Sequence, residues 1–318
     1  MPYDNVITSG DIPIPEEISD ELMTQVTEES AVMRLGRRLS NISHNQKRMP
    51  VMSAMATAYF VNGETGLKQT TEVNWTDKFI DAEELAVVVP VSNRALDDAE
   101  YDIWGEVKKS VAEAFGLAID QAVLYGTNIP ATWTTNLGAA GMVAGVTNAN
   151  HLISAASYPD LYEAILGETT AGVAGLFGLV ENDGYMVTGS ISPLAMKRKL
   201  RSVRDTMGRP IFSTNMQQAG AYLLDGAPIM FPLNGAVSET YWLIAGMWRH
   251  LVYSMRQDMT YTLATEGVIQ GANGAILYNL FQQDMIALRA VMRLGFALPH
   301  PLTRLDSGVG YPFAVLTA

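Results

Sequence analysis

Apolar residues recur at every second position near the C-terminal end of the chain. The residues in this pattern are Ile286, Leu288, Ala290, Met292, Leu294, Phe296 and Leu298. Because Arg289 and Arg293 lie on the opposite face, the pattern predicts a strand with one buried face. Residues 85–91 predict a second strand, in which Leu and Val alternate with Ala, Val and Pro. We expect this second strand to be buried on most of its surface.

A helical pattern extends from Asp97 to Tyr125. Its apolar residues recur at spacings of three and four, which defines one apolar face. They are Ile103, Val107, Val111, Ala114, Phe115, Ala118 and Ala122. Asp98 adds negative charge near the N-terminus, where the helix dipole favours it, and Gly126 is a typical C-terminal stop. After Gly116 the pattern is apolar nearly all round, so we expect a helix of roughly 40 Å whose second half is buried.

Strand-forming residues flank a polar, glycine-rich centre at residues 62–68. They are Tyr59, Phe60, Val61, Thr70, Thr71, Val73 and Trp75. Since Val, Thr, Tyr and Trp favour strands, we predict a long hairpin whose tip lies at residues 62–68. A single subunit cannot easily cover such a projection, so the pattern indicates contact with neighbouring subunits.

The N-terminal segment predicts an extended polar stretch followed by a helix that opens at Pro15, since proline is favoured in the first helical turn. Ile18, Leu22 and Val26 give this helix a narrow apolar stripe. So few apolar residues cannot stabilise an isolated helix, and we therefore expect the stripe to pack on a partner surface.

The remaining segments mix short helices and strands, an order typical of an α+β or mixed α/β layer. We predict a loop with short strand pieces at 138–150, a glycine-rich helix at 161–181, a strand at 184–189, a basic helix at 193–206, and strands at 241–247 and 251–255. The tail after Thr303 is weakly patterned. No internal repeat is present, and no linker is rich enough in Ser, Gly or Pro to separate independent domains.

Composition indicates a globular chain, because 48% of the 318 residues are hydrophobic and 17% are charged. The absence of cysteine excludes disulfides, thiolate metal sites and cysteine nucleophiles. No apolar run has the length of a membrane helix, and the N-terminus lacks the features of a signal peptide.

The sequence predicts no catalytic, cofactor or metal site. The histidines are His44, His151, His250 and His300, and none is spaced with another ligand in a metal motif. Adjacent carboxylates such as Glu83 and Glu84 point in different directions, so they make poor acid–base pairs. Neither a phosphate-binding loop nor a nucleophile elbow occurs.

Basic residues cluster at 34–38, 47–48 and 197–204, although the net charge is −12. The simplest interpretation of each cluster is a solvated helix face or loop. Proteins that bind nucleic acid through its phosphates usually present a basic patch on a basic domain, which this composition does not favour.

The order of these elements resembles the major capsid protein of tailed double-stranded DNA bacteriophages, the Hong Kong 97 type of fold. The resemblance rests on the order and spacing of short segments over nearly the whole chain. They are Thr71-Glu72-Val73-Asn74-Trp75, Glu84-Leu85-Ala86-Val87-Val88-Val89-Pro90-Val91, Leu96-Asp97-Asp98-Ala99, Asp120-Gln121-Ala122-Val123-Leu124-Tyr125-Gly126, Arg256-Gln257-Asp258-Met259-Thr260 and Gln283-Asp284-Met285-Ile286-Ala287-Leu288-Arg289.

The resemblance implies an α+β Hong Kong 97-like capsid fold with four parts. These are an N-terminal arm (1–50), an extended hairpin loop (51–92), a peripheral domain with the spine helix (93–149 and 257–318), and an axial domain (150–256). The implied inter-subunit contacts are Ile18, Leu22, Val26, Asn62, Gly63, Glu64, Lys68 and Trp75.

The implied function is structural, and the implied partners follow from it. Copies of the chain would form pentamers and hexamers of an icosahedral shell, assembled in the host bacterial cytoplasm and enclosing double-stranded DNA. Its acidic charge suits a container that touches DNA weakly. Because the chain starts at Met1 close to the arm, a separate scaffolding protein is expected, with a portal protein and a cement protein as further partners.

Some members of the family join their subunits through a lysine–asparagine isopeptide bond, with a glutamate as the base. Lys68 falls at the lysine position, whereas Asp284 occupies the asparagine position and Val291 the glutamate position. An ionised Asp is a poor acyl donor and Val cannot accept a proton, so we expect no such bond.

Two alternatives remain open from the sequence. An encapsulin-like cellular compartment of the same fold would hold cargo enzymes in place of DNA. A soluble α/β enzyme would require a cluster of titratable residues in a cleft, and the sequence indicates none.

Overall fold

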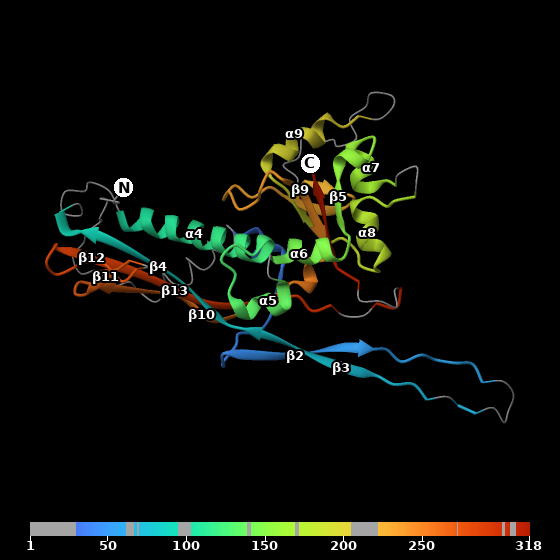
Figure 1. Ribbon diagram of the computed structural model, residues 1–318, viewed down its shortest axis with the longest axis horizontal. Coiled ribbons are helices and arrows are strands. Elements are labelled where there is room, and N and C mark those ends of the chain that lie inside the picture. The colour runs from blue at the N-terminus through green and yellow to red at the C-terminus, as the bar shows by residue number, and fades with distance from the viewer. Residues whose placement is uncertain are drawn as a thin grey trace.

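Helix α4 (Ile103–Tyr125) lies along a four-stranded sheet at one end of an elongated molecule (Figure 1). The structure, a computed structural model, describes residues 30–61, 67–68, 70–94, 103–138, 141–168, 172–204, 222–271, 273–300, 303–305 and 310–318. In spatial order, the sheet contains β1 (Arg37–Arg38), β10 (Val252–Ala264), β13 (Met285–Ala297) and β4 (Glu83–Ser92). The last three are antiparallel neighbours, and β1 pairs with β10 in parallel.

The principal apolar core lies between α4, the four-stranded sheet and three short helices. Those helices are α2 (Ala31–Leu35), α5 (Ala131–Leu137) and α6 (Gly141–Asn148). Phe115, Val123 and Leu124 of α4 are buried against Leu294 and Phe296 of β13. The buried half of α4 thus matches the part of the helix whose sequence is apolar nearly all round.

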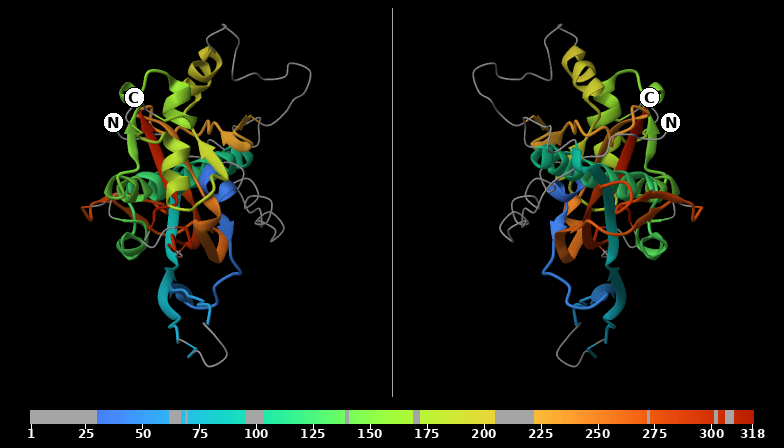
Figure 2. Two further views of the ribbon diagram at one scale, coloured as in Figure 1. Left: turned by 90° about the vertical axis from the view of Figure 1, so that its right-hand side faces the viewer. Right: turned by 90° about the vertical axis from the view of Figure 1, so that its left-hand side faces the viewer.

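A six-stranded sheet forms the second lobe (Figures 1 and 2). Its order is β5 (Leu152–Ser154), β14 (Phe313–Thr317), β9 (Tyr241–Gly246), β6 (Gly189–Ile191), β8 (Ala227–Met230) and β7 (Leu223–Leu224). Successive residues of β14 alternate between two clusters: Phe313 and Val315 join the principal core, whereas Ala314 and Leu316 join a second core.

Three helices cover the second core of this lobe. They are α7 (Leu161–Leu166), α8 (Leu176–Asn182) and α9 (Leu194–Ser202). Ile165, Phe177 and Leu200 each bury their side chains there, one from each helix. Two short 3-10 helices, η1 (Ala155–Ser157) and η2 (Trp248–His250), connect neighbouring elements.

Two further strand pairs project from this body. Strands β2 (Gln46–Ala54) and β3 (Asn74–Asp81) form an antiparallel hairpin that points away from both lobes (Figures 1 and 2). Strands β11 (Val268–Gln270) and β12 (Ile276–Asn279) form a smaller hairpin at the opposite end (Figure 1).

Several sequence predictions are confirmed. The fold is α+β, β13 and β4 occupy the predicted strands, and α4 ends at Gly126 with a φ of 71°. This positive φ is the conformation that glycine adopts at helix ends without steric cost. The predicted first turn of α4, at Asp97 and Asp98, lies outside the described residues.

Other predictions are wrong. Residues 138–150 contain α6 and not strand pieces, and the single helix predicted at 161–181 is divided into α7 and α8. Gly145 packs directly on the ring of Tyr311, so tertiary contact favours a small residue there and overrides its low helix propensity. The strand predicted at 184–189 begins only at Gly189, as β6.

The sheets also cross the predicted domain boundaries. The boundary at residue 256 falls inside β10, and β14 pairs with β5 and β9 in the six-stranded sheet although 257–318 was assigned to the peripheral domain. The hairpin begins at Gln46, within the segment predicted as arm, and β4 belongs to the four-stranded sheet although 51–92 was predicted as extended loop.

Candidate functional site

The distal part of the β2–β3 hairpin exposes large apolar side chains that contact no core. Phe60 is fully exposed (104%), as is Leu67 (92%), and Trp75 of β3 is 62% exposed. Residues 55–61 and 70–73 have no regular secondary structure, so strand formation predicted from Tyr59 to Val61 does not occur. An isolated two-stranded hairpin is marginally stable in water, and contiguous exposed apolar patches mark interaction sites.

The base of the hairpin is attached to the body by a small apolar cluster. Ile80 of β3 and Ala82 pack against Ile42, and they also meet Val252 and Ala297 from the four-stranded sheet. Additional bonds come from α5, since Trp133 Nε1 donates to the carbonyl of Asp81 at 2.9 Å. Farther out, Arg304 Nη2 donates to the carbonyl of Ala56 at 3.1 Å, just beyond β2. Phe60 and Leu67 are exposed beyond this contact, and their side chains remain available for a partner.

The structure places two of the eight predicted contact residues. Lys68 and Trp75 are both exposed on the hairpin. The other six lie outside the described residues: Ile18, Leu22, Val26, Asn62, Gly63 and Glu64.

A buried carboxylate, which the sequence analysis missed, joins three separate segments. Asp120 of α4 accepts hydrogen bonds from Ser30 Oγ (2.7 Å) and from the backbone N–H groups of Ala31 and Val32 (both 3.1 Å) at the start of α2. Asn234, which lies between β8 and β9 of the second lobe, donates its Nδ2 hydrogen to Oδ2 of the same carboxylate at 2.9 Å. The signal in the sequence was a single acidic residue within an otherwise apolar helical turn.

The environment of Asp120 favours its protonated form. Burial raises the pKa of this carboxyl, and the hydrogen bonds from Ser30, Asn234, Val32 and Ala31 oppose the shift by stabilising the charge. The bonds to Ala31 and Val32 also satisfy N–H groups that a helix N-terminus leaves without an intrahelical partner. Asp120 thus fixes the start of α2 on the long helix.

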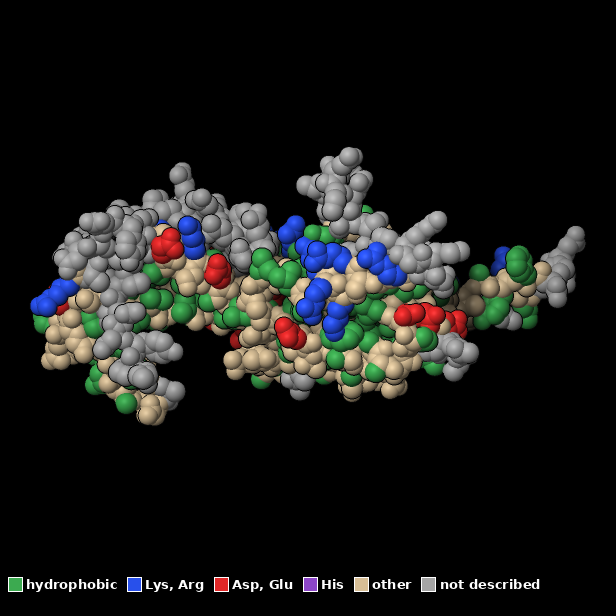
Figure 3. All heavy atoms as spheres, turned by 90° about the horizontal axis from the view of Figure 1, so that it is seen from above, with side chains coloured by type: hydrophobic (Ala, Val, Ile, Leu, Met, Phe, Trp, Pro, Cys, Tyr) green, Lys and Arg blue, Asp and Glu red, His purple; other side chains and the backbone are tan. Residues whose placement is uncertain are grey.

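Basic side chains gather over the lobe that carries α9 (Figure 3). Lys197 Nζ lies 4.2 Å from the ring centroid of Tyr222, and Lys199 Nζ lies 2.9 Å from that of Trp242. Helix α9 carries most of the basic cluster predicted at 197–204. Cation–π contacts hold these lysines against the lobe.

The residues at the predicted cross-linking positions lie far apart in one chain. Asp284 precedes β13, and its carboxylate accepts a hydrogen bond from the Asn93 side chain just beyond β4. Val291 lies within β13, where it pairs with Ala86 of β4 and Thr260 of β10. The end of β4 and the distal hairpin, which carries Lys68, lie at opposite ends of the molecule (Figure 1).

Groups suited to metal binding are not clustered in the part of the chain that the structure describes. No three His, Cys, Asp or Glu residues there are placed to hold a metal ion. His300 is half-buried beside Tyr311, and its partial removal from water lowers the pKa of its imidazole to about 4. Among the described helices, none combines the length and apolar character that crossing a membrane requires.

Comparisons with known proteins agree with this arrangement. The sequence profile described as the phage capsid family matches residues 10–302. The chain belongs to the phage capsid family. The major capsid protein of Staphylococcus phage 80alpha is 25% identical over 297 residues, covering 92% of this chain and 84% of that protein.

Solved structures give the same result for the fold. A chain from Microbacterium phage Oxtober96 superposes with a TM-score of 0.76 at 30% identity, covering 98% of this chain and 94% of that chain. A chain from Mycobacterium phage Cain superposes with a TM-score of 0.75 at 25% identity, covering 91% of this chain and 90% of that chain. This phage capsid family member therefore has the Hong Kong 97-like fold.

Membership of the phage capsid family gives the chain a structural role. It is a capsid subunit that associates with copies of itself in the shell of a virion. The relatives are named as major capsid proteins, which favours neither the enzyme alternative nor the encapsulin-like alternative. In a capsid subunit, a projecting hairpin with exposed aromatic side chains is a candidate contact between subunits.

Proposed function

We propose that the chain forms pentamers and hexamers of an icosahedral shell that encloses double-stranded DNA, and that the β2–β3 hairpin joins neighbouring subunits. The observation that carries this proposal is the exposure of Phe60, Leu67 and Trp75 on a hairpin that has no core of its own. Burying such side chains against another subunit removes apolar area from water, which is the main driving force for association.

The predicted domain roles form part of this proposal. The four-stranded sheet and α4 act as the peripheral domain, and the lobe of α7, α8 and α9 surrounds the capsomer axis. The arm, through Ile18, Leu22 and Val26, packs under a neighbouring subunit. Asn62, Gly63, Glu64, Lys68 and Trp75 are the proposed hairpin contacts.

The proposed partners extend beyond the shell itself. A scaffolding protein, a portal protein and a cement protein act during assembly in the host bacterial cytoplasm. Packaged DNA touches the shell weakly and without sequence preference, because the net charge of −12 opposes strong phosphate binding. The basic side chains of α9 are the described residues best suited to such contact.

Deleting Gly63–Leu67 tests the role of the hairpin. We expect a soluble subunit with unchanged thermal unfolding that forms no shells in electron micrographs, because the deletion removes the tip and leaves the Ile80 cluster intact. The matched control replaces the same five residues with a Gly-Ser sequence of equal length, which separates loss of contact from change in loop length. Normal shells from the deleted chain would contradict the proposal.

A further inference from the structure

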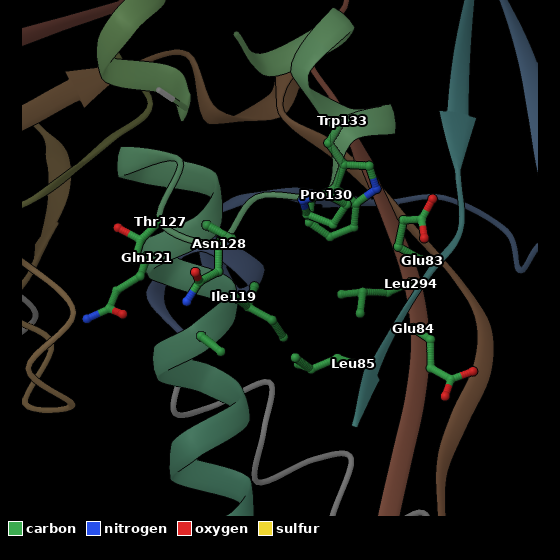
Figure 4. A pocket seen from close by; sticks show the side chains of 12 residues that line it. Glu83, Glu84, Leu85, Ile119, Gln121, Thr127, Asn128, Pro130, Trp133 and Leu294 are labelled. Atoms are coloured by element: carbon green, nitrogen blue, oxygen red, sulfur yellow. The ribbon is translucent and has the colours of Figure 1, made fainter. Parts of the chain in front are cut away.

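A cavity between α4 and β4 has the properties of a receptor for an apolar side chain (Figure 4). Its volume is about 230 Å³. The apolar lining consists of Leu85, Ala118, Ile119, Ala122, Pro130, Trp133 and Leu294. An apolar cavity of ~150 Å³ binds benzene, so this one is large enough for an aromatic side chain.

The rim of this cavity is polar and acidic on the side of β4. Glu83 and Glu84 lie there, with Gln121, Thr127 and Asn128 on the opposite side (Figure 4). Glu83 accepts a hydrogen bond from Thr132 Oγ1 at 2.8 Å. Apolar walls with a polar rim are typical of the centre of a protein interface, where an anchoring side chain enters a water-free pocket.

The distal hairpin presents a side chain and a charge that match the cavity. Phe60 is the most exposed large apolar residue of the hairpin. Lys68, on the returning side of the hairpin, is exposed as well. An exposed phenyl ring and an exposed cation on one hairpin are complementary to an apolar cavity beside two carboxylates.

Phe60 cannot reach the cavity of its own subunit. Strand β3 has eight residues, which span about 26 Å at 3.3 Å per residue, and it separates the distal hairpin from Glu83. Phe60 lies beyond the end of β2, on the side of the hairpin away from this cavity. The occupant must therefore come from a second copy of the chain.

We propose that Phe60 of one subunit inserts into the cavity between α4 and β4 of a neighbouring subunit, with Lys68 beside Glu83 and Glu84. This inference rests on the proposed role of the hairpin in joining subunits, and it names the surface that receives the hairpin. The ring fills the apolar space, and the lysine orients the hairpin by charge. The contact is heterologous, because a projection of one copy meets a different surface of the next.

Disulfide trapping tests the pairing directly, since the wild-type chain contains no cysteine. We combine Phe60→Cys with Ala118→Cys, because Ala118 is partly exposed in the cavity wall. Assembled particles of this variant, after mild oxidation, are expected to give multimers on a non-reducing gel that disappear on reduction. The control combines Phe60→Cys with Val203→Cys, which lines a different cavity beside α7 and α9, and is expected to remain monomeric.

A double-mutant cycle tests whether Phe60 and the cavity contribute to assembly through the same contact. Phe60→Ala and Ala118→Phe should each raise the subunit concentration needed for assembly by about 30-fold, because one removes the anchor and the other fills its cavity. The double variant should be no weaker than either single one, since both changes remove the same contact. The matched control Leu67→Ala should change this concentration less.

A charge exchange tests the orientation. Lys68→Glu and Glu84→Lys should each weaken assembly by a few-fold, and the double variant should restore it, with the effect decreasing at high salt. Three results would overturn the inference: trapping at Val203 but not at Ala118, additive effects of Phe60→Ala and Ala118→Phe, or no rescue by the exchanged charges. Shells that form normally without trapping at Ala118 would reject this receptor alone, whereas normal shells after deletion of Gly63–Leu67 would reject the role of the hairpin.

Discussion

The six-stranded sheet and the β2–β3 hairpin are stabilised in different ways. Strands β14 and β9 of the sheet have a core on both faces, as the division of Phe313 and Ala314, and of Ile244 and Leu243, between two clusters shows. The hairpin has a ladder of backbone hydrogen bonds and one small cluster around Ile80 at its base. The six-stranded sheet therefore buries its apolar side chains within one subunit, whereas the distal hairpin leaves Phe60 and Leu67 exposed.

The largest effect expected from this comparison is on the stability of the isolated subunit. Phe313→Ala should lower its free energy of unfolding by about 3–5 kcal/mol, because Phe313 is fully buried and packs edge-on against Trp248. Phe60→Ala is the matched control, with the same substitution at a fully exposed site, and should stay within about 0.5 kcal/mol. Urea denaturation of unassembled subunits measures both. Equal losses would show that the hairpin has an intramolecular core.

The same contrast explains which elements the sequence could predict. Strand β13 has apolar residues at alternate positions and charged residues on one outer face, so the two-residue alternation identified it as a strand. Strand β14 has the sequence Phe-Ala-Val-Leu-Thr, which is apolar on both faces and too short to separate strand from helix. It was missed because burial on both sides removes the alternation on which the prediction depends.

Side-chain partners distant in sequence were beyond prediction. Asp120 meets Ser30 and Asn234, which lie far away along the chain in both directions, and no local pattern links them. The hairpin was predicted, because strand-forming residues on both sides of a glycine-rich centre identify such a projection. Of its exposed apolar residues, Trp75 was predicted as a contact, whereas Phe60 and Leu67 were not. The cavity beside β4 is lined by residues of α4, α5, β4 and β13 and could be found only in the structure.

The second prediction concerns Asp120, which joins both lobes to α2. Asp120→Ala should lower the free energy of unfolding by about 2–4 kcal/mol, because Ser30, Asn234 and two backbone N–H groups lose their acceptor in a buried site. Asp120→Asn, which retains one oxygen and the shape, is the control and should lose less. Thermal unfolding of unassembled subunits separates the two. An equal loss in both variants would show that the charge, and not the acceptor, is required.

Asp120 also predicts a pH dependence. Because burial raises the pKa of Asp120 in the folded chain above its unfolded value of about 3.9, the folded state binds the proton more tightly. The contribution of this group to stability is therefore fully present below about pH 4 and is lost as the pH rises through the folded-state pKa. Measuring the free energy of unfolding of the wild type and of Asp120→Asn from below pH 4 upward isolates the contribution of Asp120. Parallel pH profiles for the two proteins would contradict the prediction.

The third prediction concerns the arm, which like the hairpin is expected to depend on another surface. Leu22→Asp should reduce the yield of shells, because it places a charge in the predicted apolar stripe of Ile18, Leu22 and Val26. The free energy of unfolding of the unassembled subunit should stay nearly unchanged if the stripe packs between subunits. The control Gln25→Asp changes a polar position of the same predicted helix. Equal yields for Leu22→Asp and wild type would show that the stripe makes no contact.

The smallest effect is expected on covalent linkage between subunits. Lys68 is exposed at the distal hairpin, but Val291 offers no base and Asp284 offers no amide. Attack by the lysine amine requires a base that removes its proton, and Val291, at the position of the base, cannot supply one. Mature particles boiled in detergent should therefore give a single band at the monomer mass of 34.6 kDa, and Lys68→Arg particles should give the same band. A ladder that resists boiling and vanishes in Lys68→Arg would contradict the prediction.

In that case Asn93 would be the first residue to substitute as the acyl donor. Its amide donates a hydrogen bond to the Asp284 carboxylate, so an amide lies beside an acid at the end of β4.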